Sequence, residues 1–373
     1  MEQPLSLSRR NILRAMITGA ASVAVGTQLS GSILAEDAAI PATPSKEIIG
    51  NPRVRGPFPI LSTPFTESGD VDYEVLGKQA QFVDWCGSPG MIWPQSGDSV
   101  DLLTMDEKLK GMEVLSNAMK GRKSCLCLGV QGADTEEMLV YAKKADKLEY
   151  APAIISRPPD NGKTDEDMRQ YWRALAEVTH KPVIIQTTGG TRYKGPAPST
   201  KLLIELGKDF ENFGYVKEEA SPVIPRMTEL LAAKPVIKRV MSAWGGFGWL
   251  HQCRFGTEGL ITERAVYADL LAKIWSEYDN GNRLASADLY GKLLLMLNLR
   301  ETIPCNQLRG YHLYVWMLRG VFKNTLSRNY GPLGAFPEKP IISEMKLSEE
   351  QKDEIAMRLE AIKPWLKEGD FKA

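Results

Sequence analysis

The stretch that decides the fold, residues 151–188, reads APAIISRPPDNGKTDEDMRQYWRALAEVTHKPVIIQTT. It begins and ends with short apolar runs, and a helical pattern that starts at the acidic residues 165–167 lies between them. Two apolar runs joined by an amphipathic stretch are typical of a strand–helix–strand unit with parallel strands. Strands of a parallel sheet are buried on both faces, so they are expected to be apolar throughout, as these runs are.

The same unit recurs along the chain from Phe58 onward. The apolar runs are FPILST, GMIWP, SCLCLGV, APAIIS, PVIIQTT, FGYVK, PVIKRVMS and EGLIT. Helix starts are predicted at Asp72, at Thr104 with Glu107 as a capping box, at Asp134 and at Ser199. Eight such units predict an α/β fold, specifically a (β/α)8 TIM barrel, in preference to an open doubly wound sheet. No G-x-G-x-x-G follows the first run, which weakens the dinucleotide-binding alternative.

The pattern changes after Asn280, where strands give way to helices alone. Helical segments are predicted in residues 285–301, 307–326 and 348–368, with a proline-rich loop, GPLGAFPEKPIIS, before the last of them. We therefore expect the barrel to occupy residues 53–281 and a C-terminal helical extension, packed beside it, to occupy residues 282–373.

The N-terminal segment has the layout of an export signal. The sequence SRRNILR (residues 8–14) resembles the twin-arginine motif, and residues 15–35 carry no charge. Residues 1–35 are predicted to be a twin-arginine signal peptide and residues 36–52 a linker, in a bacterial protein that is periplasmic or secreted. The alternative is a membrane anchor, although the glycines and serines make the run weakly apolar. No stable membrane insertion is expected after processing.

Charge and cysteine content limit the other classes of function. The chain has 46 basic and 46 acidic residues, and a net charge of zero argues against a nucleic-acid partner. The five cysteines form no C-x-x-C pair. We expect them to be small buried thiols rather than metal ligands or a disulfide framework.

In a barrel of this kind the active site lies at the carboxyl ends of the strands. The one obvious nucleophile among the residues at those ends is Lys217, which shares a strand face with Tyr215. A lysine held in a partly dry barrel interior favours its neutral amine, which attacks a ketone and forms a Schiff base. The alternatives are a salt bridge with a nearby glutamate, or a lysine whose tip reaches solvent.

Several stretches then resemble one family, the dihydrodipicolinate synthase / N-acetylneuraminate lyase superfamily. The stretches are ILSTPFTESGDVDYEVL, PQSGDSVDLLTMDEK, GVQGADTEEMLVYAKKAD, PVIIQTTGGTRYKG and GYVKEEA. The last is similar to the family's strand-six G-I-K-E, and the resemblance runs from about Arg53 to the end of the chain. It implies a barrel, a Schiff base at Lys217 with pyruvate or a related 2-oxo acid, and no cofactor or metal. It also implies a homo-oligomer, either a dimer or a tetramer.

The resemblance also assigns substrate-binding positions. The family's second-strand motif, whose hydroxyl residues bind the keto-acid carboxylate, corresponds here to residues 95–98. The substrate-binding residues predicted in this way are Gln95, Ser96, Gly97 and Asp98, with Thr63 at the end of the first strand.

The chain departs from the family on strand five. Gln186 stands where the family usually has a tyrosine that moves protons at the imine, and an amide cannot do this at neutral pH. Gln186 is nevertheless expected at the catalytic site beside Lys217. The proton relay is then left to Ser96, Tyr215, Asp98 or Asp160. Arg192 lies near the position where some members have a carboxylate-binding arginine.

The chain keeps the Schiff-base lysine, Lys217, but has Gln186 in place of the tyrosine that moves protons. Three functions are compatible with this combination. The first is a Schiff-base lyase or aldolase acting on pyruvate or a sugar-derived 2-oxo acid. The second is a non-catalytic protein that binds a 2-oxo acid or sugar acid, and the third is a sugar-acid dehydratase. Lysine biosynthesis is disfavoured on two grounds. The chain lacks the strand-five tyrosine and also the tyrosine that members making dihydrodipicolinate carry after strand four, where this chain offers Asp160. An exported enzyme would also not meet cytoplasmic aspartate semialdehyde.

An aromatic segment after the seventh strand, SAWGGFGWLHQCRFG, has two interpretations. Trp244 and Trp249 could stack on a sugar substrate. The alternative, which is favoured, places both tryptophans in the core, with the glycines allowing helix and sheet to pack closely.

Overall fold

The structure is a computed structural model that describes residues 48–96, 98, 100–188, 195–299, 311–329, 341–344, 346–369 and 371. The predicted signal peptide and most of the predicted linker lie outside these residues. So do Gly97 and Arg192, and the sequence predictions for them stay as they are.

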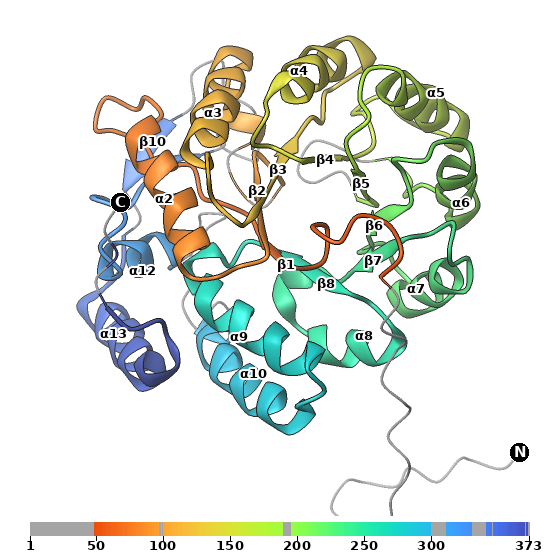
Figure 1. The fold of residues 1–373 in the computed structure, drawn as a ribbon. Helices are drawn as coiled ribbons and strands as arrows, with labels where there is room; N and C mark the ends of the chain where they lie inside the picture. Colours follow the sequence, from red (N-terminus) through yellow and green to blue (C-terminus); the bar gives the residue numbers. More distant parts are fainter. Residues whose placement is uncertain are drawn as a thin grey trace, which may run out of the picture. The chain divides into compact units, whose positions relative to one another are not determined.

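A closed barrel of parallel strands forms the centre of the fold (Figure 1). Its strands are β1 (Gly56–Pro59), β2 (Gly90–Trp93), β3 (Cys125–Gly129), β4 (Ala153–Ser156), β5 (Val183–Gln186), β6 (Tyr215–Lys217), β7 (Arg239–Met241) and β8 (Gly259–Thr262). Strands β2 to β7 pair in chain order, and β1 pairs with β8. Single bridges between Ile60 and Ile92 and between Ser242 and Leu260 close the ring. The predicted (β/α)8 barrel is confirmed.

The helices that follow the strands form a ring outside the barrel (Figure 1). They are α2 (Tyr73–Trp85), α3 (Met105–Ala118), α4 (Thr135–Lys147), α5 (Asp165–Ala176), α6 (Thr200–Asp209), α7 (Val223–Ala232), α8 (Trp249–Phe255) and α9 (Ala268–Asp279). The predicted caps are all present: Asp72, Thr104, Asp134 and Ser199 each accept a hydrogen bond from a first-turn N–H. Such caps satisfy donors that have no partner within the helix, so they fix where each helix starts.

Alternate residues of the strands fill the barrel interior. The interior cluster contains, among others, Phe58, Ile92, Cys125, Cys127, Ala153, Ile155, Ile184, Tyr215, Met241 and Ile261. Cys125 and Cys127 share this face, and burial raises the pKa of the Cys125 thiol to about 12. The four cysteines in the described part of the chain are buried free thiols, as expected, and Cys305 lies outside it.

The C-terminal extension packs on the barrel but is not all helical. It contains α10 (Arg283–Leu297), α12 (His312–Leu318) and α13 (Glu349–Ile362), with α10 against α9 and α13 against α10 and α12. Residues Leu326–Asn329 and Ile341–Glu344 are instead strands β9 and β10, which pair antiparallel. The prediction of helices alone after Asn280 was therefore wrong at these two segments.

Tertiary contacts explain why the β9 segment is extended. Its Arg328 donates to both carboxylate oxygens of Glu107 on α3, at 2.6 and 2.7 Å, and to the carbonyl oxygens of Gly69 and Leu102. Arg328 also lies over the Phe65 ring. So many tertiary contacts outweigh a weak local preference for helix. A sequence pattern alone cannot show such contacts.

The Arg328–Glu107 pair leads to a pH-dependent prediction. Burial acts to raise the pKa of Glu107, but hydrogen bonds from Arg328 and Thr104 hold that pKa below its ordinary value. The stability that this carboxylate contributes is therefore present above its unfolded-state pKa of about 4.3 and is lost as pH falls through the lower folded-state pKa. Urea unfolding should give a higher free energy of unfolding for the wild type than for Glu107→Gln at neutral pH. This difference in free energy should disappear in acid. A difference that stays constant across this range would contradict the assignment.

No helix in the described ranges is long and apolar enough to cross a membrane.

Candidate active site

Lys217 ends β6 and faces the axis of the barrel. Tyr215, two residues earlier, belongs to the interior cluster, and side chains two residues apart on a strand share a face. Lys217 is only 5% exposed, and the sheet register places it between Gln186 on β5 and Met241 on β7. The strand position predicted for this lysine is therefore the observed one.

Glu219 joins Lys217 to Gln186. The Lys217 Nζ lies 3.3 Å from Oε2 of Glu219, and Gln186 Nε2 donates to Oε1 of the same carboxylate at 2.7 Å. The Thr188 hydroxyl also donates to that Oε1. The salt bridge with a nearby glutamate, one of the alternatives considered for Lys217, is thus present. It does not decide between a structural and a catalytic lysine, because a carboxylate beside the amine can also move its protons.

Sequence reasoning assigned no role to Glu219. The available signal was its spacing: Glu219 is two residues beyond Lys217, so an extended backbone turns both side chains inward. Glu218, between them, points the other way and is fully buried. Its carboxylate accepts from Thr187 and the Ala220 N–H, both at 2.8 Å, and pairs with Arg226 on α7. Glu218 therefore anchors the end of β6 from outside while Glu219 faces the site.

A second group of predicted residues lies at the ends of β1 and β2. Asp98 accepts from the backbone N–H of Thr63 at 3.0 Å and from the Thr63 hydroxyl, and Trp93 Nε1 donates to that hydroxyl at 3.0 Å. Gln95 is fully buried. The structure thus brings Thr63 and Asp98 into contact with each other, whereas Lys217 and Gln186 meet at Glu219.

Two of the proposed proton relays are directed elsewhere. The Tyr215 hydroxyl accepts from the backbone N–H of Asn51 at 2.7 Å, at the amino ends of the strands, so it points away from Lys217. Burial raises the pKa of Tyr215, which further opposes a role in proton transfer. Asp160 lies 3.4 Å from Arg157 at the end of β4. The hypothesis that Tyr215 relays protons was wrong, because the strand face is shared but the hydroxyl is at the opposite end.

Polar atoms without partners gather at the carboxyl ends of β2 to β5. Within the described part of the chain, the buried side-chain atoms that make no hydrogen bond include Nε2 of Gln95, Oγ of Ser96, Oε1 of Gln131, Nε and Nη1 of Arg157, and Oε1 of Gln186. Arg157 was not singled out from the sequence. It follows the interior residues Ala153 and Ile155 at the same spacing, is 3% exposed, and binds Asp101 at 2.9 Å. Buried polar groups nearly always have partners, and a polar ligand bound at these strand ends would supply them.

The two tryptophans after β7 behave differently. Trp249 is fully buried, as the favoured interpretation predicted, and stacks with Trp275. Trp244 is 58% exposed and has a φ of 57°, a left-handed conformation that is uncommon outside glycine. The prediction that both tryptophans lie in the core was therefore wrong for Trp244.

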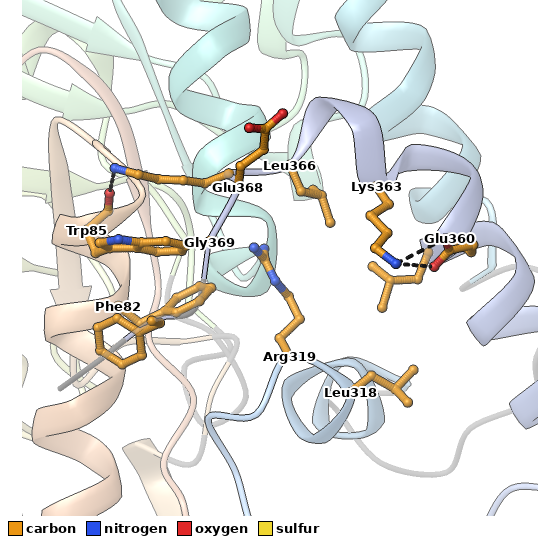
Figure 2. Close-up of a pocket in the computed structure, with 12 residues that line it drawn as sticks. Phe82, Trp85, Leu318, Arg319, Glu360, Lys363, Leu366, Glu368 and Gly369 are labelled. Carbon is orange, nitrogen blue, oxygen red and sulfur yellow. Dashed lines mark hydrogen bonds and ion pairs between the residues drawn. The ribbon is translucent and has the colours of Figure 1, made fainter.

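A cavity of about 520 Å³ lies away from these groups, on the outside of the barrel (Figure 2). It is lined by Phe82 and Trp85 at the end of α2, by Arg319 after α12 and by residues after α13, and it contains none of the predicted site residues. Its Arg319 binds the carbonyl oxygen of Val266 and the carboxylate of Asp269, so the cavity lies between the helix ring and the C-terminal extension. Because barrel enzymes work at the carboxyl ends of the strands, around the barrel axis, it is not the candidate active site. The described residues include no cluster of histidine, cysteine or carboxylate side chains that could hold a metal ion.

The fold defines a (β/α)8-barrel protein with a candidate active site at the carboxyl ends of its strands, and comparisons with known proteins agree with this fold. The profile of the dihydrodipicolinate synthetase family matches residues 53–306. The chain belongs to this family.

Individual relatives are distant. A 4-hydroxy-tetrahydrodipicolinate synthase of Parabacteroides distasonis is 30% identical over 187 residues, which are 50% of this chain and 61% of that protein. The synthase of Chlorobium chlorochromatii is 27% identical over 257 residues, which are 68% of this chain and 85% of that protein. The chain thus spans about three fifths of the Parabacteroides protein and more of the Chlorobium protein.

Solved structures show the same fold at low identity. The dihydrodipicolinate synthase of Aquifex aeolicus superposes with a TM-score of 0.68 at 20% identity, covering 84% of this chain and 100% of that one. The N-acetylneuraminate lyase of Fusobacterium nucleatum gives a TM-score of 0.69 at 17% identity, with the same coverage. The barrel and its extension are therefore shared with both kinds of enzyme.

Proposed function

We propose that the protein is a Schiff-base lyase or aldolase that makes or cleaves a carbon–carbon bond next to a 2-oxo acid. The observation that carries this proposal is the arrangement at the end of β6. A 5%-exposed lysine faces the barrel axis, with a carboxylate oxygen 3.3 Å from its amine. A buried lysine amine beside a group that can take its proton is the machinery that imine formation requires.

The chemistry follows from that amine. Lys217 adds to the C2 carbonyl of the 2-oxo acid, and loss of water leaves a protonated imine. If C4 carries a hydroxyl, loss of its proton breaks the C3–C4 bond, an aldehyde leaves, and the electron pair passes to the imine as an enamine. Protonation at C3 and addition of water then release pyruvate and restore Lys217.

The unpartnered atoms at the ends of β2 to β5 support a polar substrate. Arg157 offers two donor atoms, and Gln131 offers an acceptor. Hydroxyl groups along a sugar-derived 2-oxo acid both donate and accept, so they match such a mixed set. Gln95 and Ser96, which each have a buried unpartnered atom, suit the carboxylate end of the same molecule.

We propose that this reaction is not the one used in lysine biosynthesis. Relatives at 30% and 27% identity are named 4-hydroxy-tetrahydrodipicolinate synthase. In this chain Gln186 stands in place of the strand-five tyrosine of that family, and it contacts Glu219 instead of supplying a hydroxyl. A different proton-transfer group fits a different reaction partner.

The test is release of pyruvate from 4-hydroxy-2-oxo acids of increasing length, with pyruvate measured by a coupled hydride-transfer assay. We expect release from at least one polyhydroxylated member of the panel. A sugar-acid dehydratase would form a new 2-oxo acid without pyruvate, which mass spectrometry of the products distinguishes. Neither product from folded protein would contradict the enzymatic proposal.

A binding protein is the second candidate, and the Lys217–Glu219 ion pair is the observation that favours it. An amine held as an ammonium ion by a carboxylate binds anions but does not attack a carbonyl. Calorimetry would then show saturable binding of a 2-oxo acid or sugar acid with no product.

We further propose export by the twin-arginine route and assembly as a dimer or tetramer. N-terminal sequencing of the protein from bacterial periplasm and analytical ultracentrifugation test these two points. A cytoplasmic protein that keeps residues 1–35, or a monomer, would contradict them.

A further inference from the structure

We propose that Glu219 is the catalytic acid–base group that carries protons between Lys217 and the carbonyl oxygen of the substrate, a role for which the sequence suggested other residues. This inference rests on the proposed function, since it concerns how the imine forms. Three observations carry it: the contact between Glu219 and the amine, the way in which the carboxylate is held, and the positions of the other candidate relays.

The contact is direct and sheltered. Oε2 of Glu219 lies 3.3 Å from Nζ of Lys217, and the two side chains are 15% and 6% exposed. An acid–base group must lie within hydrogen-bonding reach of the proton that it moves, with slightly longer distances common before substrate binds. In the described part of the chain, the carboxylate that contacts the Lys217 amine belongs to Glu219.

Neighbouring side chains hold the carboxylate in a fixed orientation. Gln186 and Thr188 both donate to Oε1, and this leaves Oε2 to face the amine. The backbone N–H of Glu219 donates to the Thr187 hydroxyl at 3.0 Å. Gln186 is thus a positioning residue: its amide cannot transfer a proton, but it orients a group that can.

Three of the four relays suggested by the sequence are engaged elsewhere, and the fourth, Ser96, has a buried hydroxyl without a hydrogen-bond partner. The Tyr215 hydroxyl binds the Asn51 N–H at the far end of the barrel, Asp160 pairs with Arg157, and Asp98 binds Thr63. Glu219 therefore takes the role that the missing strand-five tyrosine leaves open.

The proton balance requires only one such group. The ammonium form of Lys217 carries three protons, and the iminium product keeps one of them on nitrogen. The other two leave with the carbonyl oxygen as water. Glu219 accepts a proton from the ammonium, which frees the amine electron pair to form the C–N bond, and then donates it to the oxygen. Repeating this step with the second proton breaks the C–O bond and releases water, so no other proton source is needed.

The test measures how fast each variant forms the imine with pyruvate, by quenching with sodium borohydride and quantifying the reduced Lys217 peptide. Glu219→Gln keeps the size and the hydrogen-bond acceptor but cannot carry a proton. It should slow trapping by roughly 10²–10⁴-fold at neutral pH. Glu205→Gln is the matched control: it removes a carboxylate on the outer helix α6 that pairs with Arg169 on α5, and it should trap at the wild-type rate.

A rescue experiment separates proton transfer from a structural role. Glu219→Ala leaves space for a small acid, and added formate should restore part of its trapping rate, while chloride at equal ionic strength should not. Thr188→Val, which removes one of the two donors to Oε1, should slow trapping less than Glu219→Gln. Circular dichroism of each variant checks that the barrel is folded.

The outcomes are distinguishable. Slow trapping in Glu219→Gln with formate rescue of Glu219→Ala supports the inference. Trapping in Glu219→Gln within about threefold of wild type, or equal rates with and without formate, overturns it and leaves the proposed Schiff base in place. No adduct in the wild-type protein overturns the proposed function and this inference with it.

Discussion

Lys217→Ala is expected to abolish imine formation and to lower pyruvate release by roughly 10³-fold or more, because it removes the nucleophile itself. The barrel should remain folded. Lys217 ends a strand whose register is set by its backbone bonds to β5 and β7, and the truncated side chain faces the open end of the barrel. Steady-state kinetics with the best substrate of the panel would measure the loss.

Lys217→Arg is the informative companion to the alanine variant. Arginine keeps a positive charge beside Glu219, so it preserves an ion pair, but it stays protonated and cannot form an imine. Both variants should be inactive. Activity on any 2-oxo acid that survives either substitution would show that the lysine is not the nucleophile. If Lys217→Arg kept ligand binding at wild-type affinity, the amine would be serving only as a charge.

The largest loss of stability is expected at the join between the barrel and its extension. Asp269 on α9 is 1% exposed and receives Arg319, after α12, through two hydrogen bonds of 2.6 and 3.0 Å. It also accepts the backbone N–H of Lys367 at 2.8 Å. Arg319 is visible at the centre of the outer cavity (Figure 2).

Asp269→Ala should lower the free energy of unfolding by about 3–5 kcal/mol, since it leaves the Arg319 charge buried and unpaired. Urea unfolding followed by circular dichroism measures this. Asp288→Ala on α10 is the matched control: its carboxylate is 64% exposed and pairs with Lys292 at 3.5 Å. That variant should change stability by less than about 0.5 kcal/mol. Equal effects of the two substitutions would contradict the structural role given to Asp269.

Most of the barrel could be predicted from local patterns. Seven of the eight apolar runs chosen from the sequence contain one of the strands β2 to β8, and the first run, which starts at Phe58, overlaps only the second half of β1. Strands buried on both faces leave an apolar signature that needs no knowledge of distant contacts. The caps at Asp72, Thr104, Asp134 and Ser199 were equally visible, since a cap and the N–H groups that it binds are close in sequence.

The C-terminal extension was less predictable because its structure depends on distant partners. The strand at Leu326–Asn329 is held by Arg328 bonding to Glu107, 221 residues away. Trp244 was assigned to the core from its apolar side chain, but an exposed left-handed turn places it outside. A local sequence pattern shows neither a contact between residues so far apart in the chain nor a positive φ angle at a single residue.

The candidate site could be predicted only in part from the sequence, again because some of its contacts depend on the folded structure. The strand rule placed Lys217 and Gln186 at neighbouring strand ends, which the register between β5 and β6 reproduces. The position of Glu219 between them depends on how two side chains turn after the strand ends. Tyr215 was wrongly proposed as a proton relay. It does share a strand face with Lys217, but its hydroxyl lies beside the backbone N–H of Asn51, at the other end of the barrel.

The central claim is that Lys217 forms an imine with a 2-oxo acid. The most direct measurement is borohydride reduction of the purified protein in the presence of pyruvate, followed by peptide mass spectrometry. The account predicts a reduced pyruvate adduct on the peptide containing Lys217, and no adduct in Lys217→Arg. Folded wild-type protein that gives no adduct with pyruvate or with any sugar-derived 2-oxo acid would contradict the Schiff-base mechanism and leave a binding protein as the function.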